Sequence, residues 1–252
     1  MQKIRKFALG AVAACVVSMA PMASQAGTIQ LGFILDESGS IGAGNWTTIV
    51  NGLSTAIGTL IPVGGADVYE ISVVTFDTAA NAAIQRVRVD SLAARSALSA
   101  SIAGLSFNGG GTSFGPAFST MTSVLSGSTA TDISASYVNF ATDGVNGDTA
   151  AGRAARNAMV AAGIDNISIE GIGGGVNVAE LTTNYCYPQP CTTAPTFNFP
   201  AQGFYIGVAN AAAYAAAIGQ KISIVVGVPE PGSFALAGLA LLGLGLARRK
   251  AA

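Results

Sequence analysis

The stretch LGFILDESGSI, residues 31–41, constrains the fold most, because an apolar run ends there abruptly in polar side chains. The run predicts a strand that is buried on both faces of a parallel sheet. Asp36, Ser38 and Ser40 follow at alternate positions, at the carboxyl end of that strand, where open α/β sheets place their binding sites. Their hard oxygen atoms, on a turn that Gly39 lets bend, are the ligands that a small divalent cation such as Mg²⁺ prefers.

The same side chains also have a purely structural explanation. Asp and Ser are preferred helix N-cap residues, and a helix is predicted to begin near Asn45. The pentapeptide DESGS alone therefore leaves helix capping and metal binding both open.

The charge of the chain is low and unevenly placed. Charged residues make up 10% of the 252 residues, against roughly 25% in an average soluble domain. Half of the twelve Lys and Arg residues lie near the two ends, so residues 28–227 carry six basic and twelve acidic groups, a net charge of −6. This balance argues against nucleic acid as a partner and favours a cation or a basic partner. The length fits one medium α/β domain with tails.

Residues 1–26 have the organisation of a secretory signal peptide. Basic residues precede an apolar run at 7–20, and residues 24–26, SQA, provide a cleavage site. Residues 12–15, VAAC, resemble a lipobox, but that alternative leaves a very short apolar region ahead of the cysteine. We therefore expect an exported protein.

The interior alternates strand and helix patterns in the order that a doubly wound sheet requires. Strands are predicted at residues 29–35, 69–76, 82–89, 134–142, 164–172 and 222–226. Helices are predicted at residues 45–60, 91–105, 114–125, 150–162 and 209–218. The polar alternation of 82–89 is typical of an edge strand, and the 150–162 helix is expected to expose Arg153 and Arg156. We therefore predict an α/β fold with a mostly parallel, six-stranded sheet flanked by helices.

Three segments of this pattern resemble the von Willebrand factor type A (VWA) domain. The family carries Asp-x-Ser-x-Ser after its first strand, a Thr in a later glycine-containing loop and an Asp after its fourth strand. In this chain the positions are filled by Asp36, Ser38 and Ser40, by Thr112 within GGGTSFGPAF, and by Asp143 within FATDG. The resemblance covers residues 28–227 and implies a Rossmann-like domain with a metal-ion-dependent adhesion site (MIDAS). Taken singly, Thr and Asp-Gly are also ordinary turn residues.

The resemblance implies a metal-dependent protein-binding module. In the family, the two serines and one carboxylate bind the cation directly, while the Thr or the second Asp binds directly or through water. We therefore expect Mg²⁺, with Mn²⁺ or Ca²⁺ as alternatives, and a protein or matrix partner that presents a carboxylate. Glu37, between the ligand positions, is expected to point away from the metal.

Residues 183–205, TNYCYPQPCTTAPTFNFPAQGFY, form a long segment that is rich in Pro and aromatic residues and lacks periodicity. In an oxidising compartment Cys186 and Cys191, within this segment, are expected to form a local disulfide. A metal site at this pair is disfavoured because the chain has no histidine. The aromatic side chains either pack on the domain, the interpretation we favour, or form a recognition surface.

The carboxyl-terminal residues 228–250 carry a second recognisable pattern. Residues 228–232, VPEPG, precede an apolar run at 233–247 and the basic residues 248–250. At about 1.5 Å per residue the run spans ~22 Å, short of a bilayer core of ~30 Å. The pattern resembles the PEP-CTERM sorting domain of Gram-negative bacteria, which implies transient inner-membrane insertion and processing by an exosortase-type enzyme. The expected location is then the cell envelope, outer surface or extracellular matrix, and a retained membrane anchor is the alternative.

An enzyme is not expected. Without histidine, without a glycine-flanked nucleophilic Ser, and with two cysteines in a disulfide, the common acyl-transfer sites cannot be assembled. Two alternatives to an adhesion module stay open. One is a structural protein of the envelope or biofilm matrix with a purely stabilising metal site. The other is a metal-dependent phosphate hydrolase, although haloacid-dehalogenase-like enzymes have a second Asp where this chain has Ser38.

Overall fold

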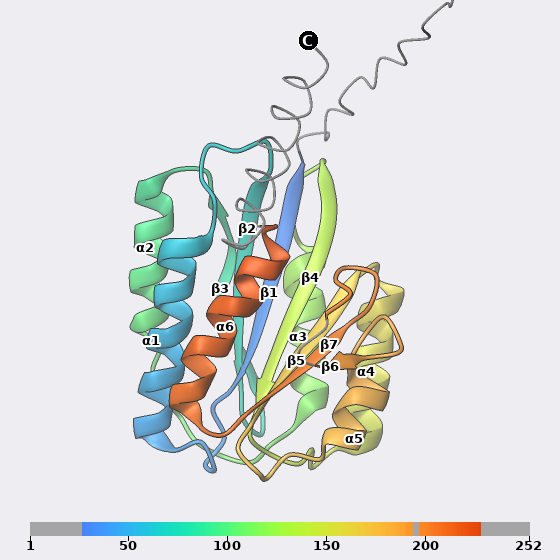
Figure 1. Cartoon of the computed structure of the whole chain (residues 1–252). Coiled ribbons are helices and arrows are strands. Elements are labelled where there is room, and N and C mark those ends of the chain that lie inside the picture. Colours follow the sequence, from blue (N-terminus) through green and yellow to red (C-terminus); the bar gives the residue numbers. More distant parts are fainter. Residues whose placement is uncertain (1–26, 194–196, 228–252) are drawn as a thin grey trace, which may run out of the picture.

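Strand β1 (Thr28–Asp36) is an interior strand of a seven-stranded sheet that is covered by helices on both faces (Figure 1). The computed structural model describes residues 27–193 and 197–227. The other strands are β2 (Val68–Phe76), β3 (Ala80–Val89), β4 (Ile133–Thr142), β5 (Asn166–Ile172), β6 (Thr192–Thr193) and β7 (Phe204–Val208). The helices are α1 (Gly42–Leu60), α2 (Leu92–Ala103), α3 (Phe114–Ser126), α4 (Thr149–Ala161), α5 (Val178–Glu180), the π-helical turn η1 (Leu181–Tyr185) and α6 (Ala211–Val225).

The sheet has the order β3-β2-β1-β4-β5-β7-β6. Strand β3, predicted as an edge strand, is at the edge and antiparallel to β2, while all other neighbouring pairs are parallel. The predicted α/β fold with a mostly parallel sheet is therefore confirmed. The strand number is corrected from six to seven, because a short edge strand, β6, pairs with β7.

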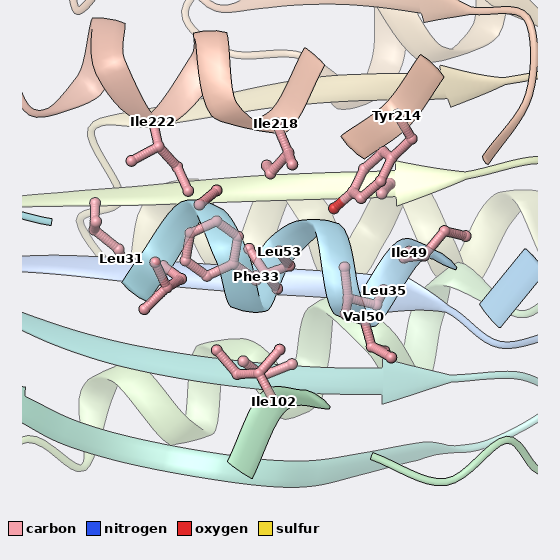
Figure 2. Packing of buried hydrophobic residues seen from close by; sticks show 14 of the residues in the cluster. Leu31, Phe33, Leu35, Ile49, Val50, Leu53, Ile102, Tyr214, Ile218 and Ile222 are labelled. Atoms are coloured by element: carbon pink, nitrogen blue, oxygen red, sulfur yellow. The ribbon is translucent and has the colours of Figure 1, made fainter. Parts of the chain in front are cut away.

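Strand β1 is buried on both faces, as its apolar sequence predicted. Leu31, Phe33 and Leu35 pack on one face against residues of α1, α2 and α6 (Figure 2). Ile34 belongs to a second apolar cluster that contains residues of α3 and α4. At Gly32 a Cβ atom would lie only 2.7 Å from the sulfur of Met121 on α3, so the absence of a side chain allows this close packing.

The carboxyl-terminal part of the domain differs from the predicted helix and strand assignment. Residues 222–226, predicted as the last strand, instead form the last turn of α6 and its C-cap, and the last strand in chain order is β7. Tyr214, Ile218 and Ile222 are buried at intervals of one helical turn, so α6 keeps one apolar face on the sheet although its end is β-branched. Asn210 caps this helix by accepting a hydrogen bond of 3.0 Å from the backbone N–H of Ala213.

The segment predicted as a long loop, 183–205, is partly regular and packs on the domain. It contains the end of η1, strand β6 and the beginning of β7. Its two cysteines form the predicted disulfide, with the Cα atoms of Cys186 and Cys191 5.9 Å apart. Phe199 lies against Tyr137 of β4, with ring centroids 4.8 Å apart. This contact supports packing as the role of that aromatic side chain.

Helix α4 buries one of the two arginines that were predicted to be exposed. Arg156 is 9% exposed, and its guanidinium donates to the carbonyl oxygens of Tyr185 at 3.1 Å and Cys186 at 2.5 Å. Arg153 is exposed, as predicted, and pairs with Glu180 at 2.5 Å. The chain of η1 lies over α4 and gives Arg156 buried acceptors, which the helical pattern alone does not reveal.

Two predicted segments, the signal peptide at 1–26 and the sorting segment at 228–250, lie outside the described residues. Among the helices of residues 27–193 and 197–227, none is both long enough and apolar enough to cross a membrane.

Candidate metal centre

Two adjacent parallel strands bring the predicted carboxylates to the same edge of the sheet. Asp36 is the last residue of β1, and Asp143 directly follows β4, which pairs with β1. Because parallel strands end at a common edge, residues more than one hundred positions apart in sequence become neighbours there. The candidate site therefore lies at the lower edge of the sheet in Figure 1.

The turn after β1 is joined to Asp143 by a chain of hydrogen bonds. The backbone N–H of Ser38 donates to Asp36 Oδ1 at 2.8 Å. The hydroxyl oxygens of Ser38 and Ser40 lie 3.1 Å apart, and Ser40 Oγ donates to Asp143 Oδ1 at 2.8 Å. Four of the five predicted ligands thus form one connected cluster.

The fifth predicted ligand, Thr112, lies against the loop that follows β4. A Cβ atom on Gly144 would be 3.2 Å from Thr112 Oγ1, and the backbone N–H of Gly147 donates to Thr112 O at 2.8 Å. The glycine-rich loop also reaches the first turn, because Gly39 N donates to Gly110 O at 2.9 Å. The structure therefore brings all three sequence segments of the predicted site together.

Helix capping does not account for the polar residues of the first turn. Helix α1 begins at Gly42, its N-cap is Ile41, and no side chain makes a capping hydrogen bond there. The hydroxyls of Ser38 and Ser40 are directed to each other and to Asp143. This geometry argues against helix capping as the role of the two serines.

Glu37 has a structural role beside the site. It is 2% exposed, and its carboxylate accepts hydrogen bonds of 3.3 Å from both the backbone and the side-chain nitrogen of Asn108. Glu37 therefore holds the glycine-rich loop against the first turn.

Further positioning residues were not identified from the sequence. Thr142 Oγ1 donates to Asp36 Oδ2 at 2.5 Å, and Thr78 Oγ1 accepts a hydrogen bond of 2.8 Å from Gly111 N. Thr142 directly precedes Asp143 and ends the strand that pairs with β1, and this pairing, which the sequence pattern does not give, places Thr142 beside Asp36. Thr78 follows β2 and gave no signal in the sequence, because turn threonines are common.

The two carboxylates are in an environment that disfavours their charges. Asp36 is 2% exposed. Burial raises the pKa of Asp36 to about 6, against the lowering effect of hydrogen bonds from Ser38 and Thr142, and the charge of Asp143 adds a small increase. Burial likewise raises the pKa of Asp143, and the hydrogen bond from Ser40 opposes this shift. A positive charge between the carboxylates would favour their ionised forms.

The donor set fits a hard divalent cation. It consists of two carboxylates and three hydroxyls, all of them oxygen donors of the type that Mg²⁺, Mn²⁺ and Ca²⁺ accept. Across the described parts of the chain there is no cluster of three or more His, Cys, Asp or Glu side chains that could hold a metal. A metal site built from the five predicted residues would therefore depend on hydroxyl ligands.

Family comparison agrees with this arrangement. The sequence profile of the von Willebrand factor type A domain matches residues 30–199, about two thirds of the chain. The chain belongs to the von Willebrand factor type A domain family. A second profile, that of the PEP-CTERM protein-sorting motif, matches residues 227–250 and confirms the predicted tail motif, which indicates export to the cell envelope or surface.

Solved structures share the VWA fold. Proximal thread matrix protein 1 from the mussel byssus has a TM-score of 0.57 and 15% identity, over 80% of this chain and 46% of that protein. A von Willebrand factor type A protein from Catenulispora acidiphila has a TM-score of 0.60 and 19% identity, over 80% and 43%. Manganese-loaded TRAP protein from Plasmodium vivax has a TM-score of 0.53 and 20% identity, over 76% and 72%.

Another structure of the mussel protein, with a TM-score of 0.56 and 18% identity, has a zinc-occupied MIDAS motif; it aligns over 78% of this chain and 45% of that one. The VWA chain described here spans less than half the length of the mussel and Catenulispora proteins. At these identities the likeness shows the fold alone. No curated protein gave a sequence match.

Proposed function

We propose that this VWA domain is an exported adhesion module that binds an acidic group of a protein or matrix partner through a divalent cation. The observation that carries the proposal is the convergence of three loops at one edge of the sheet, where Ser40 joins the first turn to Asp143 at 2.8 Å. The residues that would hold the cation are Asp36, Ser38, Ser40, Thr112 and Asp143. Mg²⁺ is the first choice, with Mn²⁺ or Ca²⁺ as alternatives. Support also comes from the zinc and manganese named for the mussel and Plasmodium structures.

Hydrogen bonds within the chain already orient part of the proposed site. Both carboxylate oxygens of Asp36 already accept hydrogen bonds, from Ser38 N and from Thr142 Oγ1, so the orientation of the side chain is fixed. Ser40 is exposed, which leaves the site open to solvent and to a partner. A bound cation would supply a positive charge that attracts a carboxylate of the partner.

One exposed apolar side chain lies beside the site. Val145, two residues after Asp143, is 62% exposed. A cavity of about 90 Å³, lined in part by Val145 and Asn177, adjoins the loop of Asp143. An apolar group next to the acidic group of the partner would be able to contact Val145.

The proposal is tested by pull-down from the extracellular matrix of the native host with the exported protein as bait. With Mg²⁺ present we expect retained matrix components, which EDTA releases and which the Asp36→Ala variant fails to retain. Capping the carboxylates of the matrix extract with a carbodiimide and an amine should abolish retention. Retention that survives both EDTA and capping would contradict the proposal.

The same experiment distinguishes an adhesion module from a structural protein whose metal site is purely stabilising. Asp90→Ala serves as the matched bait control, since the Asp90 side chain is 58% exposed and lies outside the three converging loops. This variant should retain the same components as the unchanged protein. Metal binding without any retained component would instead favour a structural protein whose cation only stabilises the fold.

The location follows from the two ends of the chain. We propose that residues 1–26 are removed on export and that an exosortase-type enzyme processes residues 228–250 after transient insertion in the inner membrane of a Gram-negative host. Mass spectrometry of the carboxyl-terminal peptide tests this proposal. The surface or matrix fraction should lack the basic residues 248–250, and recovery of that intact end solely in the inner membrane would contradict the proposal.

A further inference from the structure

A second group of polar side chains is buried between helix α6 and the sheet. Lys221 comes from α6, Asn139 from β4, and Glu170 from β5, the neighbour of β4. The side chains of Lys221 and Glu170 are 3% and 0% exposed. Asn139 is 5% exposed. None of the three is a candidate metal ligand, and the strand and helix patterns give them no role.

The amine of Lys221 contacts both partners. Its Nζ donates to Asn139 Oδ1, and each carboxylate oxygen of Glu170 lies 3.1 Å from Nζ. The ring centroid of Phe204 is 5.2 Å from the same nitrogen. In the described part of the chain, Asn139 Nδ2 has no hydrogen-bond partner. A primary amine is thus held against the carbonyl of a primary amide, with a carboxyl group beside the amine.

Burial shifts both members of the pair toward their uncharged forms. Burial raises the pKa of Glu170 and lowers the pKa of Lys221 to about 8, while the attraction between the two groups opposes both shifts. Transfer of one proton from Lys221 to Glu170 converts the ion pair into a neutral amine and a neutral acid, with no change in net charge. The neutral amine carries the electron pair that a nucleophile requires.

We propose that Lys221 and Asn139 become joined by an intramolecular isopeptide bond, with Glu170 as the catalytic group that transfers the protons. The Nζ electron pair forms a bond to Asn139 Cγ, and the Cγ–Nδ2 bond breaks. Starting from the neutral amine and the neutral acid, Glu170 delivers its proton to Nδ2, which leaves as ammonia with both electrons of the broken bond, and takes one proton from Nζ. One amine and one primary amide give one secondary amide and one ammonia, so no oxidant, reductant or cofactor is required. Glu170 ends in its starting state.

A small cavity adjoins the reacting atoms. Its volume is about 20 Å³, and its lining includes Asn139, Ser168 and Lys221. A cavity of roughly 10–15 Å³ or more on this measure holds one water molecule. Ammonia is similar in size, so the leaving group has space beside the bond that releases it.

The bond would tie the last helix of the domain to its central sheet. It joins residues that are 82 positions apart. Strand β4 leads directly into Asp143, and α6 leads into the sorting motif at 227–250. A force between a ligand on the metal site and the carboxyl end would then pass through a covalent link instead of pulling α6 from the sheet. This consequence rests on the proposed function, whereas the bond itself does not.

The test is the intact mass of the purified full chain, measured after denaturation and reduction. The expected mass is lower than that of the linear chain by one ammonia molecule. Because succinimide formation at an asparagine also releases ammonia, proteolysis and tandem mass spectrometry must show a branched peptide that joins Lys221 to Asn139. A linear mass, or the absence of this branched peptide, would overturn the proposal whatever the metal site does.

Three variants assign the roles. Asn139→Ala and Lys221→Ala should both have the linear mass. Glu170→Gln, which keeps the side-chain size, should also stay linear, while Glu180→Gln on α5, outside this cluster, should lose ammonia like the unchanged chain. Complete bond formation in Glu170→Gln would overturn the catalytic role of Glu170. The mass of the unchanged chain remains decisive even where a variant fails to fold.

Discussion

Thr142 and Asp36 join the ends of two neighbouring strands through a hydrogen bond of 2.5 Å from Thr142 Oγ1 to Asp36 Oδ2. The other oxygen of the carboxylate accepts from Ser38 N at 2.8 Å. The Asp36 side chain is therefore held from β4 and from its own turn, so its orientation does not depend on a bound ion. Outer contacts of this kind fix the geometry of ligands in metal sites.

Thr142→Val should weaken metal binding without removing a ligand. The substitution removes the hydroxyl that orients Asp36, and loss of such an outer contact typically costs about 10- to 100-fold in metal affinity. Calorimetric titration with Mg²⁺ measures the change. Thr122→Val is the matched control, because the Thr122 hydroxyl donates to Phe118 O within α3. Equal affinities of the two variants would show that Thr142 does not position the site.

Gly110→Ala should disturb the site through the glycine-rich loop. The φ angle of Gly110 is 137°, and a Cβ atom there would lie 2.7 Å from Asp77 Oδ2. The methyl group must displace either the Asp77 side chain or the loop whose carbonyl accepts from Gly39 N, and the positive φ angle adds strain, so we expect a stability loss of about 1–3 kcal/mol. Metal affinity should fall by about tenfold or more.

Urea unfolding and Mg²⁺ titration of the Gly110→Ala variant provide both measurements. Gly65→Ala is the control, because a Cβ atom at Gly65 would have no heavy atom within 4 Å. If the two alanine variants behave alike, the contact between the glycine-rich loop and the first turn has no energetic importance.

Arg156→Ala should destabilise the fold more than Arg153→Ala on the same helix. Truncation of Arg156 leaves the carbonyls of Tyr185 and Cys186 without their charged donor in a buried place, at a cost of about 1–3 kcal/mol. Arg153 is exposed, so solvent screens its ion pair with Glu180. Urea unfolding of both variants measures the difference. An effect of Arg153→Ala as large as that of Arg156→Ala would contradict this account.

Much of the central sheet could be predicted because its strands have unambiguous patterns. Strand β1 has no polar side chain between Leu31 and Leu35, and both of its faces are buried. The candidate ligands Asp36 and Asp143 could be placed at one edge because they follow parallel strands. The register of the sheet then brought them together as expected.

The remaining features depend on contacts that a local pattern does not contain. The run ISIVV at residues 222–226 has strand-like composition, yet Ile222 continues the buried face of Tyr214 and Ile218 in α6. Arg156 is polar on a helix, but η1 covers it and offers carbonyl acceptors. Strand β7 was missed because its residues lie at the end of a Pro-rich segment and pair only with distant β5 and short β6.

The most direct test of the metal site is the thermal shift that Mg²⁺ produces in the purified exported protein and in its Asp36→Ala variant. A ligand that binds only the folded state stabilises it, by about 2.7 kcal/mol at a free concentration 100 times the dissociation constant. We predict a clear rise in Tm for the unchanged chain and for Asp90→Ala. The rise should be reduced in Asp143→Ala and almost absent in Asp36→Ala. An equal rise in Tm for all four proteins would contradict the assignment of the metal site.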